Sequence, residues 1–133
     1  MEKIIQLLKN CPAIYMGTVS PEGQPHVRPF GLAYEKDGQL FFSTSPKTSA
    51  YKDLNNHPFV EMSTGSTDTW VRIKAKAIFV DDIETKKQVL QHNTFLNNYF
   101  KNADNPEFII FTLTCGTAQI YDHFGTPPEF YHF

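Results

Sequence analysis

The chain has 133 residues, a length typical of one domain, and we predict that residues 1–133 form a single domain. Hydrophobic residues make up 41% of it and charged residues 20%, which argues against disorder, and no apolar run has the ~18 residues that a membrane span needs. Twelve basic against fourteen acidic residues give a net charge of -2, so we expect no nucleic-acid partner and no membrane partner.

The N-terminal third of the chain predicts one helix and three strands. Residues 2–9 place four aliphatic side chains on one helical stripe, and Asn10 and Pro12 end that helix. Two turn sequences, SPEGQ and KDGQ, separate three strand-like runs. We expect these strands at about 13–19, 25–35 and 40–44. Strands joined by such short turns form an antiparallel meander.

The middle of the chain predicts a short helix and two further strands. Pro46 suits the start of a helix within residues 45–58, and the sequence NNHP ends it. A strand is expected at 59–64, followed by a loop. Residues 70–80 then alternate between two faces, as a half-buried strand does.

The C-terminal part predicts a longer helix and a long strand. The helix is expected at 83–100 and the strand at 108–122, with a bulge or bend at Gly116. The tail 123–133 is aromatic, so we expect it to pack against another part of the protein. Six strands in total predict a mainly β fold with flanking helices. A six-stranded antiparallel barrel, closed or nearly closed, would hide the sheet edges.

The common catalytic motifs are absent, and no catalytic residue stands out. The five histidines have no ligand spacing typical of a metal site, so we expect no bound metal. Cys11 and Cys115 lack a partner motif and are expected as reduced thiols. Because the N-terminus also lacks a secretory signal pattern, we expect a cytoplasmic location.

One cluster of residues predicts an anion site. His26 and Arg28 share a strand face, and the next strand ends in hydroxyl residues before a short helix begins. The N–H groups and the dipole of a helix N-terminus attract phosphate, and an arginine adds a bidentate contact. The candidates are Arg28, Ser43, Thr44, Lys47, Thr48 and Lys52. The alternative is an ordinary helix cap with solvated lysines.

A second cluster lies on one face of the strand 70–80. Trp70, Arg72 and Lys74 alternate with apolar residues, and together they suit a planar anionic aromatic ligand. Stacking would come from the indole ring and charge from the two cations. The alternative is the exposed face of an edge strand.

The stretch from Ala13 to about Val80 resembles the FMN-binding split-barrel family of pyridoxamine 5'-phosphate oxidase and its relatives. The resemblance rests on the hairpin GQPHVRPFGLAYEKDGQLFFST, the helix sequence KTSAYKDLNNHP and the strand WVRIKAKAIFV. The helix 83–100 and the strand 108–122 fit in order and length. The resemblance implies a split β-barrel, FMN as the cofactor, and a homodimer with two flavin sites at its interface.

The resemblance also implies roles for particular residues. Arg28 falls on an arginine at the flavin, and Pro29, Phe30 and Gly31 would follow the isoalloxazine ring with their backbone. Ser43 and Thr44 fall on the family's pair at the end of the third strand. Trp70 falls where the oxidases have a polar residue that reaches the flavin from the partner subunit.

Three departures argue against oxidation of pyridoxamine phosphate. Ser49 and Ala50 stand where true oxidases have an Arg-Lys pair, and Ala33 stands where they have a lysine for the substrate phosphate. The tail HFGTPPEFYHF also lacks the C-terminal oxidase signature. We therefore expect an FMN-dependent oxidoreductase acting on another small molecule. The alternatives are a non-catalytic flavin, deazaflavin or haem binder that serves as a store, sensor or regulator, and an empty structural barrel or nucleic-acid binder.

Overall fold

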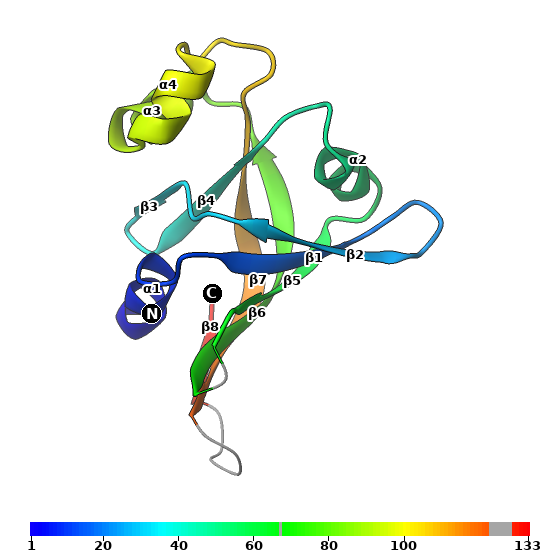
Figure 1. The fold of residues 1–133 in the computed structure, drawn as a ribbon, viewed down its shortest axis with the longest axis vertical. Helices are drawn as coiled ribbons and strands as arrows, with labels where there is room; N and C mark the ends of the chain where they lie inside the picture. Colours follow the sequence, from blue (N-terminus) through cyan, green and yellow to red (C-terminus); the bar gives the residue numbers. More distant parts are fainter. Residues whose placement is uncertain (67, 123–128) are drawn as a thin grey trace.

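Strands dominate the computed structural model, which describes residues 1–66, 68–122 and 129–133 (Figure 1). The helices of these residues are α1 (Glu2–Lys9), α2 (Ser49–Asn56), α3 (Ile83–His92) and α4 (Thr94–Phe100). The strands are β1 (Ile14–Val19), β2 (Pro25–Phe30), β3 (Tyr34–Lys36), β4 (Gln39–Thr44), β5 (Phe59–Thr64), β6 (Thr69–Val80), β7 (Ile109–Asp122) and β8 (Glu129–His132).

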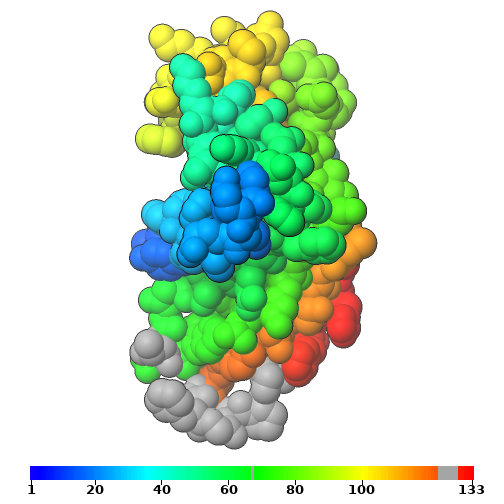
Figure 2. Space-filling model, turned by 90° about the vertical axis from the view of Figure 1, so that its right-hand side faces the viewer, coloured from blue at the N-terminus to red at the C-terminus, as the bar shows by residue number. Residues whose placement is uncertain are grey.

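All of these strands belong to one antiparallel sheet, which curls around an apolar core. The strand order is β2-β1-β5-β6-β7-β4-β3, and β8 pairs with β7. The predicted mainly β fold of the split-barrel type, with flanking helices, is therefore confirmed. Helix α2 lies beside the β1–β2 hairpin, and α3 and α4 lie together at one end of the molecule (Figure 2).

The predicted count of six strands was too low, because the described residues contain eight. The run expected at 25–35 is divided, since residues 31–33 leave the ladder between β2 and β3. The first half pairs with β1 and the second with β4, at opposite ends of the strand order. The chain therefore crosses from one edge of the sheet to the other at this point.

The helix expected at 83–100 is two helices, because Asn93 starts a new one. Its side-chain oxygen accepts a hydrogen bond from the Leu96 N–H at 3.0 Å, and its amide group donates to the Ala33 carbonyl at 3.0 Å. This cap ties α4 to the segment that links β2 with β3. A contact so distant in sequence gives no local signal.

Aromatic rings fill the centre of the curled sheet. Phe42 and Phe111 are fully buried and stacked at 5.6 Å between ring centres, and Phe30 meets both edge-on. The predicted alternation of β6 is present: alternate residues from Val71 to Ala77 are buried, whereas Phe79, the next residue on that face, is 36% exposed. Near the end of β6 the ring of Phe79 packs on Tyr51 of α2 and also meets Phe111 of the core edge-on.

The bulge predicted at Gly116 is confirmed. Lys74 and Lys76 of β6 are two residues apart, whereas their partners on β7, Thr117 and Thr114, are three apart, so β7 has one additional residue here. Within this bulge Cys115 has a positive φ of 51°. The backbone of Gly116 pairs in both directions with Phe133. Residues 129–133 of the tail thus pack on β7 as expected, whereas 123–128 lie outside the described residues.

We expect Gly116→Ala to destabilise the fold by about 1–3 kcal/mol, as overpacking does. A Cβ atom there would lie 2.9 Å from the Lys74 carbonyl oxygen and 2.4 Å from the Phe133 ring. Denaturant unfolding measures the loss. Gly31→Ala is the matched control, since a Cβ at Gly31 meets nothing within 4 Å. Equal stability of the two variants would contradict the prediction.

Candidate functional site

The predicted anion site lies at the N-terminus of α2, where Thr48 is the N-cap. Its hydroxyl oxygen accepts from the Tyr51 N–H at 3.1 Å and lies 2.7 Å from the Thr44 hydroxyl. The first N–H groups of a helix have no hydrogen-bond partner within the helix, so those of Ser49 and Ala50 are available at the N-terminus of α2. Capping thus fixes Thr44 and Thr48 and directs the next N–H groups outward.

The predicted cations approach this helix end to different degrees. Arg28 reaches it directly, since its Nη2 donates to the Ser49 hydroxyl at 3.3 Å. Lys47 has a side chain that is 81% exposed and an ion pair with Glu107 at 3.4 Å, and Lys52 is exposed on α2. The two lysines therefore stand beside the helix end as solvated charges.

The remaining predicted residues from β2 to β4 divide between surface and core. Pro29 and Gly31 are exposed, whereas the ring of Phe30 packs into the aromatic core. Ser43 is half-buried beside Thr44. Gly31 is thus exposed on the segment that crosses from β2 to β3, the two edges of the sheet, and we refer to this crossing as the mouth of the barrel.

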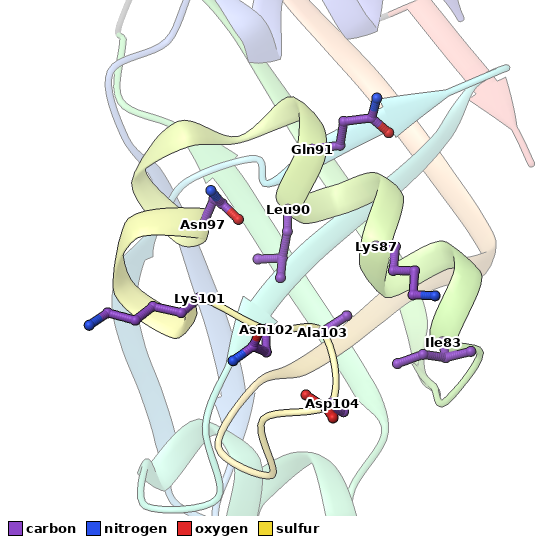
Figure 3. A pocket seen from close by; sticks show the side chains of 9 residues that line it. All are labelled: Ile83, Lys87, Leu90, Gln91, Asn97, Lys101, Asn102, Ala103 and Asp104. Atoms are coloured by element: carbon purple, nitrogen blue, oxygen red, sulfur yellow. The ribbon is translucent and has the colours of Figure 1, made fainter.

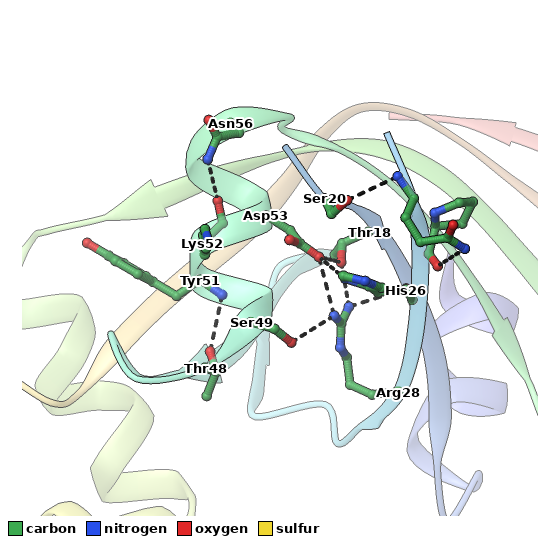
Figure 4. Close-up of polar contacts among 12 residues, drawn as sticks. Thr18, Ser20, His26, Arg28, Thr48, Ser49, Tyr51, Lys52, Asp53 and Asn56 are labelled. Atoms are coloured by element: carbon green, nitrogen blue, oxygen red, sulfur yellow. Dashed lines mark hydrogen bonds and ion pairs between the residues drawn. The ribbon is translucent and has the colours of Figure 1, made fainter. Parts of the chain in front are cut away.

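A buried carboxylate, not predicted from the sequence, organises this corner (Figure 4). Asp53 is 1% exposed, and its Oδ2 atom accepts from the Thr18 hydroxyl at 2.7 Å. The same oxygen lies 2.9 Å from Nδ1 of His26 and 3.5 Å from Nη2 of Arg28. Nη1 of Arg28 donates to the Thr18 hydroxyl at 2.6 Å. We refer to Thr18, His26, Arg28, Ser49 and Asp53 as the Asp53 cluster.

The partners of Asp53 keep it ionised. Burial by itself would raise the pKa of its carboxyl group, but hydrogen bonds from Thr18, His26 and Arg28 outweigh burial and hold the pKa below the usual 3.8. A negative charge therefore remains inside the cluster at neutral pH. It directs the guanidinium of Arg28 toward α2.

Spacing along α2 carries a weak signal for this carboxylate. Asp53 and Leu54 lie three and four residues after Ala50, at helical spacing, and all three are buried. The sequence favours an inward position for Leu54 and not for Asp53, because an aspartate is usually solvated.

The second predicted cluster lies on the outer face of β6. Trp70 stacks on Tyr121 at 4.1 Å between ring centres, and the guanidinium of Arg72 lies 5.2 Å from the indole ring. Nε of Arg72 also pairs with Glu61 at 3.1 Å, while Lys74 is exposed. Strands β1 and β5 separate β6 from β2, so one chain does not bring these residues to Arg28.

Three hollows mark the surface of the described residues, and one of about 560 Å³ lies between α1 and the β3–β4 turn, away from both predicted clusters. The remaining two lie elsewhere on the sheet and the helices. One, of about 750 Å³, lies on the outer face of β1, β5 and β6 and is lined in part by Tyr15, Val27, Phe59, Arg72 and Lys74. The other, of about 550 Å³, lies between α3, α4 and the loop after them (Figure 3). Its two lysines, Lys87 and Lys101, point away from each other, so they do not converge on one ligand.

The described residues contain neither a metal site nor a membrane-spanning helix that would point to a function. Within residues 1–66, 68–122 and 129–133, no three His, Cys, Asp or Glu side chains gather as a metal site. None of the helices in the described part of the chain is long and apolar enough to cross a membrane. Cys11 and Cys115 are free thiols in the structure.

Comparison with known proteins identifies relatives across the whole fold. The profile of the pyridoxamine 5'-phosphate oxidase family matches residues 1–121. A NimC/NimA family protein from Clostridium acetobutylicum is 25% identical, with a TM-score of 0.86 over 100% of this chain and 92% of that chain. General Stress Protein 26 from Bacillus anthracis is 19% identical, with a TM-score of 0.78 over 99% of this chain and 97% of that one.

A haem-binding protein from Mycobacterium smegmatis shares the fold at lower identity. It is 12% identical, with a TM-score of 0.77, and the match covers 98% of this chain and 57% of that chain. A search of curated proteins finds no match.

The buried carboxylate predicts a pH-dependent contribution to stability. Since the pKa of Asp53 is lower in the folded state than its usual 3.8, the contribution is complete above about pH 4 and is lost as the pH falls through the folded value. We expect Asp53→Asn to lower stability at pH 7 by about 1–3 kcal/mol. The difference from the wild type should shrink toward pH 3.

Denaturant unfolding at several pH values measures this difference. Asp104→Asn, which changes an exposed carboxylate, is the control and should match the wild type throughout. A constant Asp53→Asn deficit from pH 7 to pH 3 would contradict the assignment of this charge.

Proposed function

The chain belongs to the pyridoxamine 5'-phosphate oxidase family, and from that premise we propose that it is an FMN-binding flavoprotein acting as an oxidoreductase on a small molecule. The observation that carries the proposal is the helix end of α2, where Arg28 meets Ser49 at 3.3 Å beside an open row of N–H groups. The match to the family profile also supports FMN as the cofactor. So does the position of Arg28 and Ser49 where β2, β4 and α2 meet.

The phosphate of FMN fits the N-terminus of α2. The N–H groups of Ser49 and Ala50 would donate to it, and Arg28 would add a charge-assisted contact from the side of β2. Thr44, Thr48 and Ser43 line the approach from β4. Lys47 and Lys52 are solvated and close enough in sequence to turn toward a bound anion.

The ring system would lie along the exposed backbone of Pro29, Phe30 and Gly31. Gly31 leaves open space where a Cβ would stand, so a flat ring can approach the main chain there. The flavin supplies the electron transfer, and the chain supplies binding, orientation and charge. Because the aromatic core fixes Phe30 from below, the backbone at this mouth is held in place.

The substrate differs from pyridoxamine 5'-phosphate in this proposal. Ala33 is 8% exposed and offers no cation for a substrate phosphate, and Ser49 and Ala50 offer none in the first turn of α2. A substrate without a phosphate group fits this site better. The electron donor would be a reduced nicotinamide or another small reductant.

A second copy of the chain would complete the site. Val27 is 69% exposed, Phe59 67% and Tyr15 45%, and all three line the hollow on the outer face of β1 and β5. Apolar side chains gathered in one place on a surface favour burial against a partner. The partner would bring its Trp70, with Arg72 and Lys74 beside it, to the flavin that the first copy holds.

We expect the purified protein to bind FMN with the two-band visible spectrum of a flavin, and riboflavin at least tenfold more weakly. Arg28→Ala should weaken FMN binding more than tenfold, because a charge-assisted contact of about 1.5–3 kcal/mol is lost. Fluorescence quenching on titration measures both. Lys36→Ala removes an exposed cation of β3 and should bind as the wild type does.

Equal affinity for FMN and riboflavin would contradict the phosphate site. A deazaflavin or haem spectrum would keep the fold and replace the proposed cofactor. Slow reduction of bound flavin by both NADH and NADPH would favour a store or sensor over an oxidoreductase.

We also expect a homodimer in sedimentation, and Val27→Glu should shift it toward monomer. A carboxylate in the middle of an apolar interface lacks a partner and costs several kcal/mol on burial. Phe95→Glu is the matched control, since Phe95 is 76% exposed on α4, away from this face. A monomeric wild type would contradict the shared site.

A further inference from the structure

The Asp53 cluster contains a proton acceptor that the flavin site does not require. Nδ1 of His26 lies 2.9 Å from Oδ2 of Asp53, and the side chain of His26 is 40% exposed. The imidazole can therefore exchange a proton with solvent while its other nitrogen stays on the buried carboxylate. Histidine is the side chain whose charge ordinarily changes near physiological pH.

The side chains of His26 and Arg28 share one carboxylate oxygen in this cluster. The guanidinium of Arg28 approaches the same Oδ2 atom at 3.5 Å, and its Nη1 lies 3.4 Å from the His26 carbonyl oxygen. With a neutral imidazole, the charges of Asp53 and Arg28 cancel. With a protonated imidazole, His26 compensates the carboxylate, and one positive charge is left over beside Ser49.

We propose that His26, held by Asp53, makes the anion site at α2 proton-dependent, so that the site binds phosphate-bearing ligands more tightly in acidic than in neutral solution. This inference rests on the proposed function, because it takes the FMN phosphate as the anion at Ser49. The role of His26 is that of a positioning residue with a variable charge. It acts on the ligand through Arg28 and the local potential.

Few other groups can produce the same dependence. Besides Asp53, helix α2 carries Tyr51, which packs on Phe79, and Lys52, and it ends at His57. Strand β2 carries Arg28, and strand β1 carries only Tyr15 as a titratable side chain, which lines the hollow on the outer face. His57 is therefore the competing histidine on these elements, and His57→Gln is the matched control.

The direction of the effect separates it from titration of the ligand itself. The FMN phosphate gains negative charge near pH 6, so a site of constant charge binds it as well or better as the pH rises. A site that loses a proton from His26 over the same range binds it more weakly.

The experiment measures the FMN dissociation constant of the wild type, His26→Gln and His57→Gln at steps from pH 5.5 to pH 8. We expect wild type and His57→Gln to lose about threefold to tenfold in affinity across this range. His26→Gln should stay level or gain affinity. Parallel profiles for the wild type and His26→Gln would overturn the inference while leaving the flavin site intact.

A second measurement follows the histidine directly. Proton NMR of the wild type gives the titration midpoint of His26, assigned with His26→Gln, in the absence and presence of inorganic phosphate. We expect phosphate to raise the midpoint, and an unchanged midpoint would overturn the inference. If the protein fails to bind FMN, the proposed function fails, and this titration still decides whether the cluster is a proton-dependent anion site.

Discussion

A carboxylate that is buried in a small protein must be paired, and the pairing of Asp53 determines how α2 lies against the sheet. Its partners come from β1 and β2, so the central turn of the helix is fixed to the β1–β2 hairpin. The N-terminus of α2 follows from that attachment. The open N–H groups at this end face the same side as Arg28, which is why one corner combines a helix end with a guanidinium.

The aromatic core has a comparable effect on the mouth of the barrel. Phe30, Phe42 and Phe111 pack together where β2, β4 and β7 curl toward one another. Residues 31–33 then cross between the two edges of the sheet, and the side chain of Asn93 holds their backbone. The segment proposed to lie along the flavin ring is thus supported from the core on one side and from α4 on the other.

In the proposed dimer, the separation of the two candidate clusters gives the second chain its role. Trp70, Tyr121 and Arg72 form a preassembled stack on the outer face of β6 and β7, and the strands β1 and β5 separate β6 from the edge strand β2. In the proposed dimer, a flat anionic ligand held at α2 would meet the stack of the partner chain. The exposed apolar side chains around Val27 and Phe59 provide the surface on which a partner's stack would be brought near.

Local patterns determined a large part of this protein. The sequence alone predicts the β1–β2 hairpin, the alternation of β6 and the bulge at Gly116, because turn residues and two-residue periodicity act over short distances. It also predicts the helix end with Thr44 and Thr48, since capping is a local interaction. Only the tertiary structure decided the break at 31–33, the contact between Asn93 and Ala33 and the role of Asp53. Each depends on partners 27 to 60 residues away, and local spacing does not encode such contacts.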